Sequence, residues 1–194
     1  MKNVALTITA MLSSAIMLSA QTWNIDPTHS NVGFTVTHFF SEVNGQFTDY
    51  SGEFNIDPNN VEDASISFTV KVGSVDTDDE KRDGHLMTED FFNESKYPEM
   101  TFESTDIKKK SENKYVAIGN LTIKDVTKKA EIPFEVLGVM NHPMVENAQL
   151  MGVKFQYELM RTAYNVGTGK WAMTKVVGDK VKVDINMELI NKKG

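Results

Sequence analysis

Apolar and polar residues alternate along most of this chain, which is the periodicity of β-strands that bury one face. The clearest runs lie at 64–72 and 181–189, where every second residue is apolar. One long segment, Ser74–Phe102, breaks the alternation. A chain of this kind is constrained to an antiparallel β-structure that carries a single insert of another type.

The segment Ser74–Phe102 carries the start and stop signals of a helix. Thr77 and Glu80 stand three residues apart, which is the spacing of a capping box. Pro98 biases the residue before it toward extended backbone, so the next strand is predicted to begin there. We therefore predict a helical insert over about 77–93 that covers one end of the β-structure. Its apolar residues are expected to turn inward: Leu86, Met87, Phe91 and Phe92.

The strands number about eight, and turn signals separate them at the spacing of hairpins. Between 45 and 56 the apolar positions change phase, with Phe47 in one phase and Phe54 and Ile56 in the other. A bulge or sharp bend near 49–52 explains this change, and such bends let a sheet coil on itself. We predict a mainly β fold, a closed antiparallel barrel of about eight strands. A β-sandwich is the alternative that the pattern leaves open.

The first twenty residues have the features of a secretory signal peptide. Lys2 is their only charge, an apolar run follows it, and Ser19-Ala20 forms a small-residue cleavage site. An uncleaved membrane anchor is the alternative, although the run is short for a membrane span. We expect cleavage near Ala20, a periplasmic or secreted protein, and a single domain over 21–194.

Composition excludes several classes of protein. The chain has no cysteine, so it can form no disulfide and offers no thiolate as nucleophile or metal ligand. Its formal net charge of −7 argues against nucleic acid as a partner, because phosphate binding requires a basic surface. The sequence carries none of the common catalytic or nucleotide-binding motifs, and we expect a protein that is not an enzyme.

Four histidines are scattered through the chain without the spacing of a metal site. His29, His38 and His85 would form one only if their elements met at one mouth of the barrel, and we expect no metal. His38 shares a strand face with Val36 and Phe40. It is either a hydrogen-bonded core residue or a polar contact on a cavity wall.

The interior of the predicted barrel is not determined by composition. An eight-stranded barrel is either filled by its own side chains or wide enough for one small ligand. Eleven phenylalanines and eleven methionines supply enough apolar volume for either arrangement. Both a filled and a hollow barrel therefore remain open.

An ordered set of motifs resembles the YceI-like family over nearly all of the chain, from about Trp23 onward. The insert carries the most distinctive of them, Arg82–Leu86 followed by Asp90–Phe92. The others are Asp26–Phe34, Gly45–Gly52, Gly119–Ile123 and Val177–Val181. The resemblance implies a secreted or periplasmic lipocalin-like barrel that encloses a polyisoprenoid or similar amphiphilic lipid, as a carrier or store rather than an enzyme.

Two stretches depart from the pattern of that family. Lys124–Lys128 lacks the histidine and glycine that members often have there. Met160–Val166 keeps Arg161 but carries Ala163 and Asn165 where an acid and a glycine are usual. The resemblance therefore says less about head-group contacts at that end of the barrel.

The leading hypothesis assigns two sets of residues to a bound lipid. Its apolar chain is expected to contact residues turned inward by the strands and the insert: Phe34, Val36, Phe40, Phe47, Leu86, Phe91, Phe92 and Phe102. Its polar head is expected at the mouth, near His29, His38, Arg82, His85 and Arg161. No cofactor is expected beyond a lipid such as an isoprenoid quinone or a prenyl phosphate. The expected partners are this lipid and, transiently, a membrane, for a monomer or a homodimer.

Two other functions remain open. One is an enzyme that acts on an amphiphile in the same cavity, with His85 and Asp83 as acid and base. The other is a filled barrel that serves as an interaction module, dimeric through an exposed strand edge.

Overall fold

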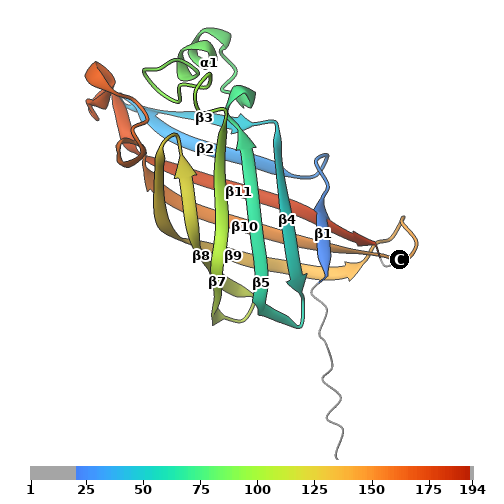
Figure 1. Ribbon diagram of the computed structural model, residues 1–194. Helices are drawn as coiled ribbons and strands as arrows, with labels where there is room; N and C mark the ends of the chain where they lie inside the picture. Colours follow the sequence, from blue (N-terminus) through green and yellow to red (C-terminus); the bar gives the residue numbers. More distant parts are fainter. Residues whose placement is uncertain (1–20, 193–194) are drawn as a thin grey trace, which may run out of the picture.

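The alternating segments form strands in the computed structural model, which describes residues 21–192 (Figure 1). The predicted signal peptide, residues 1–20, lies outside the described residues. The strands are β1 (Thr22–Ile25), β2 (Asn31–His38), β3 (Ser41–Phe47), β4 (Tyr50–Asp57), β5 (Asn60–Lys71), β6 (Val75–Asp76), β7 (Glu99–Ser111), β8 (Lys114–Ile123), β9 (Val126–Asn141), β10 (Ala148–Met160) and β11 (Val177–Lys192). The helices are α1 (Glu80–Leu86) and the short 3-10 helices η1 (Val72–Ser74), η2 (Arg161–Tyr164) and η3 (Gly169–Ala172).

Eight of the strands close into a ring, in the order β1, β4, β5, β7, β8, β9, β10 and β11, and β11 pairs back to β1. All of these pairings are antiparallel. The predicted closed antiparallel barrel is therefore confirmed, and the β-sandwich alternative is wrong. Closure leaves the strands of the ring without open edges, which explains how long strands such as β9 and β11 remain protected.

Along one of its edges, β11 pairs first with β2 and then with β1. The first part of β11 pairs with β2, from Val177 opposite His38 to Asn186 opposite Asn31, and its last part pairs with β1. The strands β3 and β6 extend the wall beyond β2. The strand beside this edge of β11 is therefore β1 at one end of the barrel and β2 at the other.

The predicted change of phase falls between β3 and β4. Phe47 ends β3 with its ring buried, and Phe54 and Ile56 are buried from β4 after the break at 48–49. Gly52 follows the break, where β4 lies so close to β5 that a Cβ atom would meet the ring of Phe68 at 2.8 Å. The bend therefore depends on a position that has no side chain.

The insert covers the top of the barrel in the view of Figure 1, but only part of it is helical. The helix α1 spans Glu80–Leu86, and the residues after it form turns rather than a second helical segment. The predicted capping box is wrong, because Asp79 is the N-cap and accepts hydrogen bonds from the amides of Lys81 and Arg82. Thr77 instead donates to the carboxylate of Asp83.

The apolar core is densest toward the end of the barrel that lies away from the insert. Five large side chains there are at most 1% exposed: Trp23, Ile56, Met151, Val153 and Leu189. The indole of Trp23 also donates a hydrogen bond of 2.9 Å to the carbonyl of Ile56. This end of the barrel is filled by its own side chains. None of the helices among residues 21–192 has the length and apolar character needed to cross a bilayer.

Candidate functional site

A cavity of about 210 Å³ lies inside the other half of the barrel, next to the insert. The densely packed side chains Trp23, Ile56, Met151 and Leu189 do not line it. Both sequence-based alternatives for the interior are thus realised in one barrel, which is filled at one end and hollow at the other. For comparison, an engineered cavity of about 150 Å³ is large enough to bind benzene.

The wall of the cavity is apolar because the inward positions of successive strands are. The last strand alone contributes Val177, Val181, Val183, Ile185 and Met187. Thr101, Tyr157 and Arg161 are the lining residues with a polar side chain. A cavity of this composition favours an apolar ligand, since polar groups of a ligand would lose water without gaining partners.

Aromatic rings join the barrel wall to the insert. The ring of Phe47 on β3 lies 5.5 Å from that of Phe34 and 6.1 Å from that of Phe92, centroid to centroid. Phe92 belongs to the turns after α1, so the insert packs onto the wall through an edge-to-face aromatic contact. The insert therefore forms one side of the cavity, together with Leu86 and Phe91.

A second cover comes from the connection between β10 and β11, which runs from 161 to 176. It packs on the insert through a small buried cluster of Phe91, Ile123, Tyr164 and Val166. Lys124 fastens the two covers together, since its ammonium donates to the carbonyls of Phe91 and Asn165, each at 2.7 Å. Burial lowers the pKa of Lys124 from its ordinary value.

The two departures from the family pattern take part in this contact. Asn165 stands where a glycine is usual, and its φ of 57° is left-handed, a conformation that asparagine tolerates better than most residues. The lysine that replaces a common histidine is the one that binds its carbonyl. The substitutions therefore preserve a turn and bridge the two covers.

His85 is part of a polar contact between the covers and does not line the cavity. Its Nε2 lies 3.1 Å from Oδ2 of Asp90, and the indole of Trp171 donates to the same oxygen at 3.1 Å. The rings of His85 and Trp171 lie 4.9 Å apart, edge to face. The hydrogen bond from His85 lowers the pKa of Asp90, with a further contribution from Trp171. These contacts give His85 a structural role in joining the insert to 161–176.

Arg161 is buried, 3% exposed, and lies against the cavity. Its guanidinium donates to five backbone carbonyls of the following segment: Gly178 at 2.8 Å, Val166 at 2.8 Å, Gly167 at 3.5 Å, Trp171 at 2.8 Å and Val177 at 2.7 Å. Burial lowers the pKa of Arg161, and the charge of Asp179 offsets part of that shift. The side chain thus fixes the loop that covers the barrel, and its donors are already occupied.

Seven of the eight residues assigned to the lipid chain line the cavity: Phe34, Val36, Phe47, Leu86, Phe91, Phe92 and Phe102. The inward placement of Phe40 is wrong. Its side chain is fully exposed at 103%, because the preceding residue, Phe39, takes a positive φ of 52° and the chain reverses there. The alternation that predicted an inward Phe40 ends two residues before it, at His38.

Of the five residues assigned to the polar head, only Arg161 lines the cavity. Arg82 binds Thr77, donating from Nε to the hydroxyl at 2.7 Å and from Nη2 to the carbonyl at 2.5 Å. His38 is exposed at the end of β2, edge-on to Phe39. The convergence of His29, His38 and His85 does not occur, because strand alternation predicts faces but not how loops fold back.

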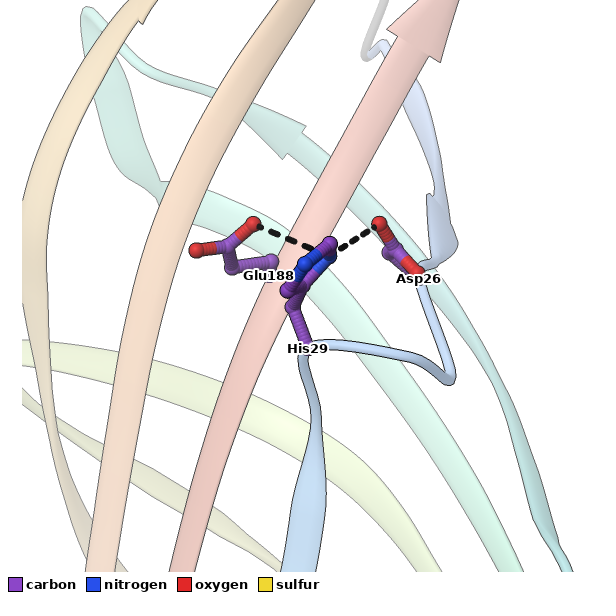
Figure 2. A group of neighbouring side chains, drawn as sticks. All are labelled: Asp26, His29 and Glu188. Carbon is purple, nitrogen blue, oxygen red and sulfur yellow. Dashed lines mark hydrogen bonds and ion pairs between the residues drawn. The ribbon is translucent and has the colours of Figure 1, made fainter.

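His29 lies in the turn between β1 and β2, in a cluster with Asp26 and Glu188 (Figure 2). Its Nδ1 lies 2.9 Å from Asp26 Oδ2 and 3.9 Å from Glu188 Oε2. The hydrogen bond with Asp26 raises the pKa of His29, and the same bond lowers the pKa of Asp26.

Within 21–192, these three are the one group whose potential metal-ligand atoms all lie within 4.8 Å of one another. A hydrogen-bonded ion pair accounts for the arrangement of Asp26 and His29, and the amide of Asp26 is also bonded to the carbonyl of Glu188 at 2.9 Å. The cluster therefore secures the turn against β11 at the point where the barrel closes. That the chain holds no metal remains a prediction.

The acid–base pair required by an enzymatic function is not assembled. Asp83 accepts hydrogen bonds from Thr77, whereas His85 is bonded to Asp90. Neither Asp83 nor His85 lines the cavity. The geometry of these two residues thus gives no support to acid–base chemistry there.

Sequence reasoning missed several lining residues, although their signal was present. Leu121, Ile123, Tyr157 and Leu159 alternate along β8 and β10 as Phe34 and Val36 do along β2. Each strand was predicted, but the half of each strand that faces the cavity was not. That choice depends on where the ring is filled, which involves strands far apart in sequence.

The fold and the site define a class of protein: closed antiparallel barrels with an apolar cavity that is covered at one end by an insert and a loop. Comparison with known proteins identifies the member of this class. The family model described as the YceI-like domain matches residues 23–189. The chain therefore belongs to the YceI-like family.

Relatives and solved structures agree with this assignment. A UPF0312 protein of Photorhabdus laumondii is 38% identical over 152 residues, 77% of this chain and 71% of its own length. BcnA of Burkholderia cenocepacia has a similar structure, with a TM-score of 0.76 and 27% identity over 87% of this chain and all of its own. The YceI protein of Campylobacter jejuni gives a TM-score of 0.71 and 30% identity, with 79% and 88% coverage.

A more distant domain from Saccharophagus degradans, described as polyisoprenoid-binding and implicated in plant cell wall breakdown, shares the fold alone. Its TM-score is 0.64 at 13% identity, and the match covers 89% of this chain and 99% of that domain.

Proposed function

We propose that this protein binds an amphiphilic lipid, with the apolar chain in the cavity beneath the insert. The observation that carries the proposal is the cavity itself, whose lining is apolar except for Thr101, Tyr157 and Arg161. Membership in the YceI-like family supports it, and the polyisoprenoid-binding domain of Saccharophagus degradans has the same fold. The protein acts as a carrier or store and catalyses no reaction on the lipid.

The volume of the cavity limits how the ligand is held. At about 210 Å³ it is larger than a benzene site of about 150 Å³, but smaller than the ~300–1,000 Å³ typical of drug-sized ligands. The cavity therefore takes a segment of a hydrocarbon chain, and a long polyisoprenoid requires the covers or the aromatic side chains to move. Phe34 and Phe92 pack against Phe47 at the boundary between wall and insert and are the side chains expected to shift.

Tyr157 is the lining residue best suited to contact the polar part of the lipid. The phenol is protonated at neutral pH, since its ordinary pKa is 10.0 and burial raises it, so the hydroxyl can donate a hydrogen bond. Within the part of the chain that is described, no side-chain hydrogen bond occupies this hydroxyl, whereas the donors of Arg161 are all engaged. An isoprenoid quinone or a prenyl alcohol or phosphate would offer the acceptor.

The proposal places the protein in the periplasm or outside the cell, after removal of the segment that ends near Ala20. The absence of cysteine is compatible with either compartment, since the fold relies on its core and not on disulfides. The oligomeric state, monomer or homodimer, does not enter the binding mechanism, because the cavity is formed within one chain.

The test is native mass spectrometry of gently purified protein, followed by solvent extraction and identification of the lipid. Protein stripped of lipid is then incubated with farnesol, a short-chain ubiquinone and undecaprenyl phosphate. We expect a bound species in at least one of these experiments. Protein that emerges bare and takes up none of the three probes would contradict the proposal.

A pair of variants on β11 locates the bound chain. Val183→Trp projects a large ring into the cavity, whereas the neighbouring Lys182→Trp adds the same ring to an exposed position on the opposite face. We expect the fraction of lipid-bound protein to fall at least tenfold in the first variant and to remain unchanged in the second. Equal occupancy in the two variants would show that the lipid lies elsewhere.

A further inference from the structure

The turn between β2 and β3 presents two adjacent phenylalanines to solvent. Phe39 is 56% exposed and Phe40 is fully exposed, at 103%. Most monomeric proteins tolerate single exposed apolar residues, but two neighbouring aromatic rings at the tip of a hairpin form a patch that requires an explanation. We call these two residues and Met173, which is 58% exposed on the adjacent loop, the apolar tip.

The backbone of the apolar tip is strained in a way that displays these rings. Phe39 has a φ of 52°, in the left-handed region that bulky residues rarely adopt. Glycine or asparagine would form the same turn without this strain, and neither is present. Backbone strain at an exposed aromatic position points to a function of the side chains rather than to a requirement of folding.

The apolar tip lies at the hollow end of the barrel and not at its filled end. The amide of Phe39 donates to the carbonyl of Val176 at 2.9 Å, which ties the hairpin to the 161–176 cover. The lining residue Val177 directly follows Val176, and another lining residue, Val36, lies three positions before Phe39. The tip and both covers therefore lie at the same end of the barrel, the end that carries α1 in Figure 1.

The loop beside the apolar tip carries two lysines, and one acid of the insert, Asp90, accepts a hydrogen bond from its Trp171 and lies near Lys170. The segment 168–177 contains Lys170 and Lys175 and no acidic residue, although the protein carries a formal charge of −7. The nearest acid on the hairpin, Glu42, is paired with Lys182 at 2.9 Å. Two exposed rings flanked by lysines suit the interface of a bilayer that carries anionic head groups.

A second group of exposed apolar residues lacks this charge pattern. Leu137, Val139, Met140 and Met144 are exposed on β9 and the loop that follows it. The sequence from 135 to 149 contains Glu135 and Glu146 and no lysine or arginine, so this group would be repelled by an anionic surface. It supplies a matched control.

We propose that the apolar tip docks on an anionic phospholipid bilayer and brings the hollow end of the barrel to the membrane from which lipid enters. This inference rests on the proposed lipid-binding function and names the surface at which that function operates. Phe39 and Phe40 enter the interface between head groups and acyl chains, Met173 lies beside them, and Lys170 and Lys175 contact the head groups.

The test is flotation of purified protein with phosphatidylcholine vesicles that contain or lack phosphatidylglycerol. We expect binding to the anionic vesicles that weakens with added salt. Phe39→Ser/Phe40→Ser is expected to lower the partition coefficient at least tenfold, and Lys170→Gln/Lys175→Gln roughly fivefold for each lysine. The control Leu137→Ser/Met140→Ser is expected to bind as the unmodified protein does.

Unchanged binding by the Phe39→Ser/Phe40→Ser variant, or no binding by the unmodified protein, would overturn the proposal. The proposal would also be overturned if the Phe39→Ser/Phe40→Ser variant sedimented as a monomer, the unmodified protein sedimented as a dimer, and the two floated equally. The tip would then contact a second copy of the chain. Mass spectrometry measures in parallel the lipid retained in the cavity. We expect the same lipid in the unmodified protein and in the Phe39→Ser/Phe40→Ser variant. An empty cavity with intact vesicle binding would refute the lipid-binding function and not the docking surface.

Discussion

Replacement of Arg161 by methionine separates a structural role of this buried cation from a role in lipid binding. Methionine keeps most of the apolar length of the side chain but removes all five hydrogen bonds to the loop carbonyls. Four of these bonds are 2.7–2.8 Å long, and the fifth, to Gly167, is 3.5 Å. At about 1 kcal/mol for each short bond, the free energy of unfolding is expected to fall by about 4 kcal/mol.

A loss of that size is a large fraction of the stability of a typical domain, which is about 5–15 kcal/mol. Relief of the buried charge limits the loss, since burial already lowers the pKa of the guanidinium. Arg161→Lys is expected to lose somewhat less, because an ammonium has three donors and cannot span the same carbonyls. The control is Lys170→Met, which removes an exposed cation from the same segment and should change stability by less than about 0.5 kcal/mol.

The assay is urea unfolding of lipid-free protein, followed by far-ultraviolet circular dichroism and by tryptophan fluorescence. Trp171 lies in the loop that Arg161 holds, and Trp23 lies in the packed end of the barrel, so early loss of the loop would separate the two signals. The reasoning is refuted if Arg161→Met unfolds within about 1 kcal/mol of the unmodified protein. If that variant also failed to retain lipid, Arg161 would be a head-group ligand after all.

Three further predictions follow from individual contacts. The His29–Asp26 pair is expected to stabilise the fold between the ordinary pKa values of its members, 3.8 and 6.5, since the pKa of Asp26 is lowered and that of His29 raised. His29→Gln should therefore lower the thermal unfolding midpoint most near pH ~5. This decrease should vanish as the pH rises through the raised pKa of His29 or falls through the lowered pKa of Asp26. Gly119→Ala places a Cβ atom against a carbonyl oxygen of β7 and should cost about 2 kcal/mol in urea unfolding, whereas Gly152→Ala, whose nearest neighbour lies at 3.4 Å, should be nearly neutral. Burial raises the pKa of Tyr164 to about 12, so an ultraviolet titration that loses its component near that pH in Tyr164→Phe would assign it to this phenol; stability should fall between the ordinary value of 10.0 and 12.

The predictions that held were those carried by local periodicity. The alternation along 64–72 and 181–189 placed β5 and β11, and the phase change between Phe47 and Phe54 placed the bend between β3 and β4. Leu86, Phe91 and Phe92 were placed inward from composition within one short insert, and they line the cavity. Each of these inferences concerns neighbours along the chain, where the geometry of a strand or turn relates position to direction.

Most of the predictions that failed required loops to fold back on the barrel, and one local prediction, the capping box of Thr77 and Glu80, failed as well because Asp79 is the N-cap. Phe40 was extrapolated one step beyond the strand that supported it. Arg82 and His85 were placed at the mouth because they lie in the insert, and His38 because it continues the strand face of Val36. The structure instead binds Arg82 to Thr77 and His85 to Asp90. The hydrogen-bond partners of a side chain with several donors depend on how the loop around it folds, and the periodicity of the sequence does not predict them.

The sequence by itself determined that the fold is mainly β, where the insert lies and which family the chain resembles, whereas closure of the barrel is seen only in the structure. It also determined that the inward faces of strands such as β5 and β11 are largely apolar, because most of their alternate residues are. Only the tertiary structure decided that the barrel is filled around Trp23 and hollow beneath the insert, and that Arg161 holds a loop. The physical reason is that packing volume and hydrogen-bond partners depend on eight strands brought into one ring, whereas the direction of a side chain depends on its own strand alone.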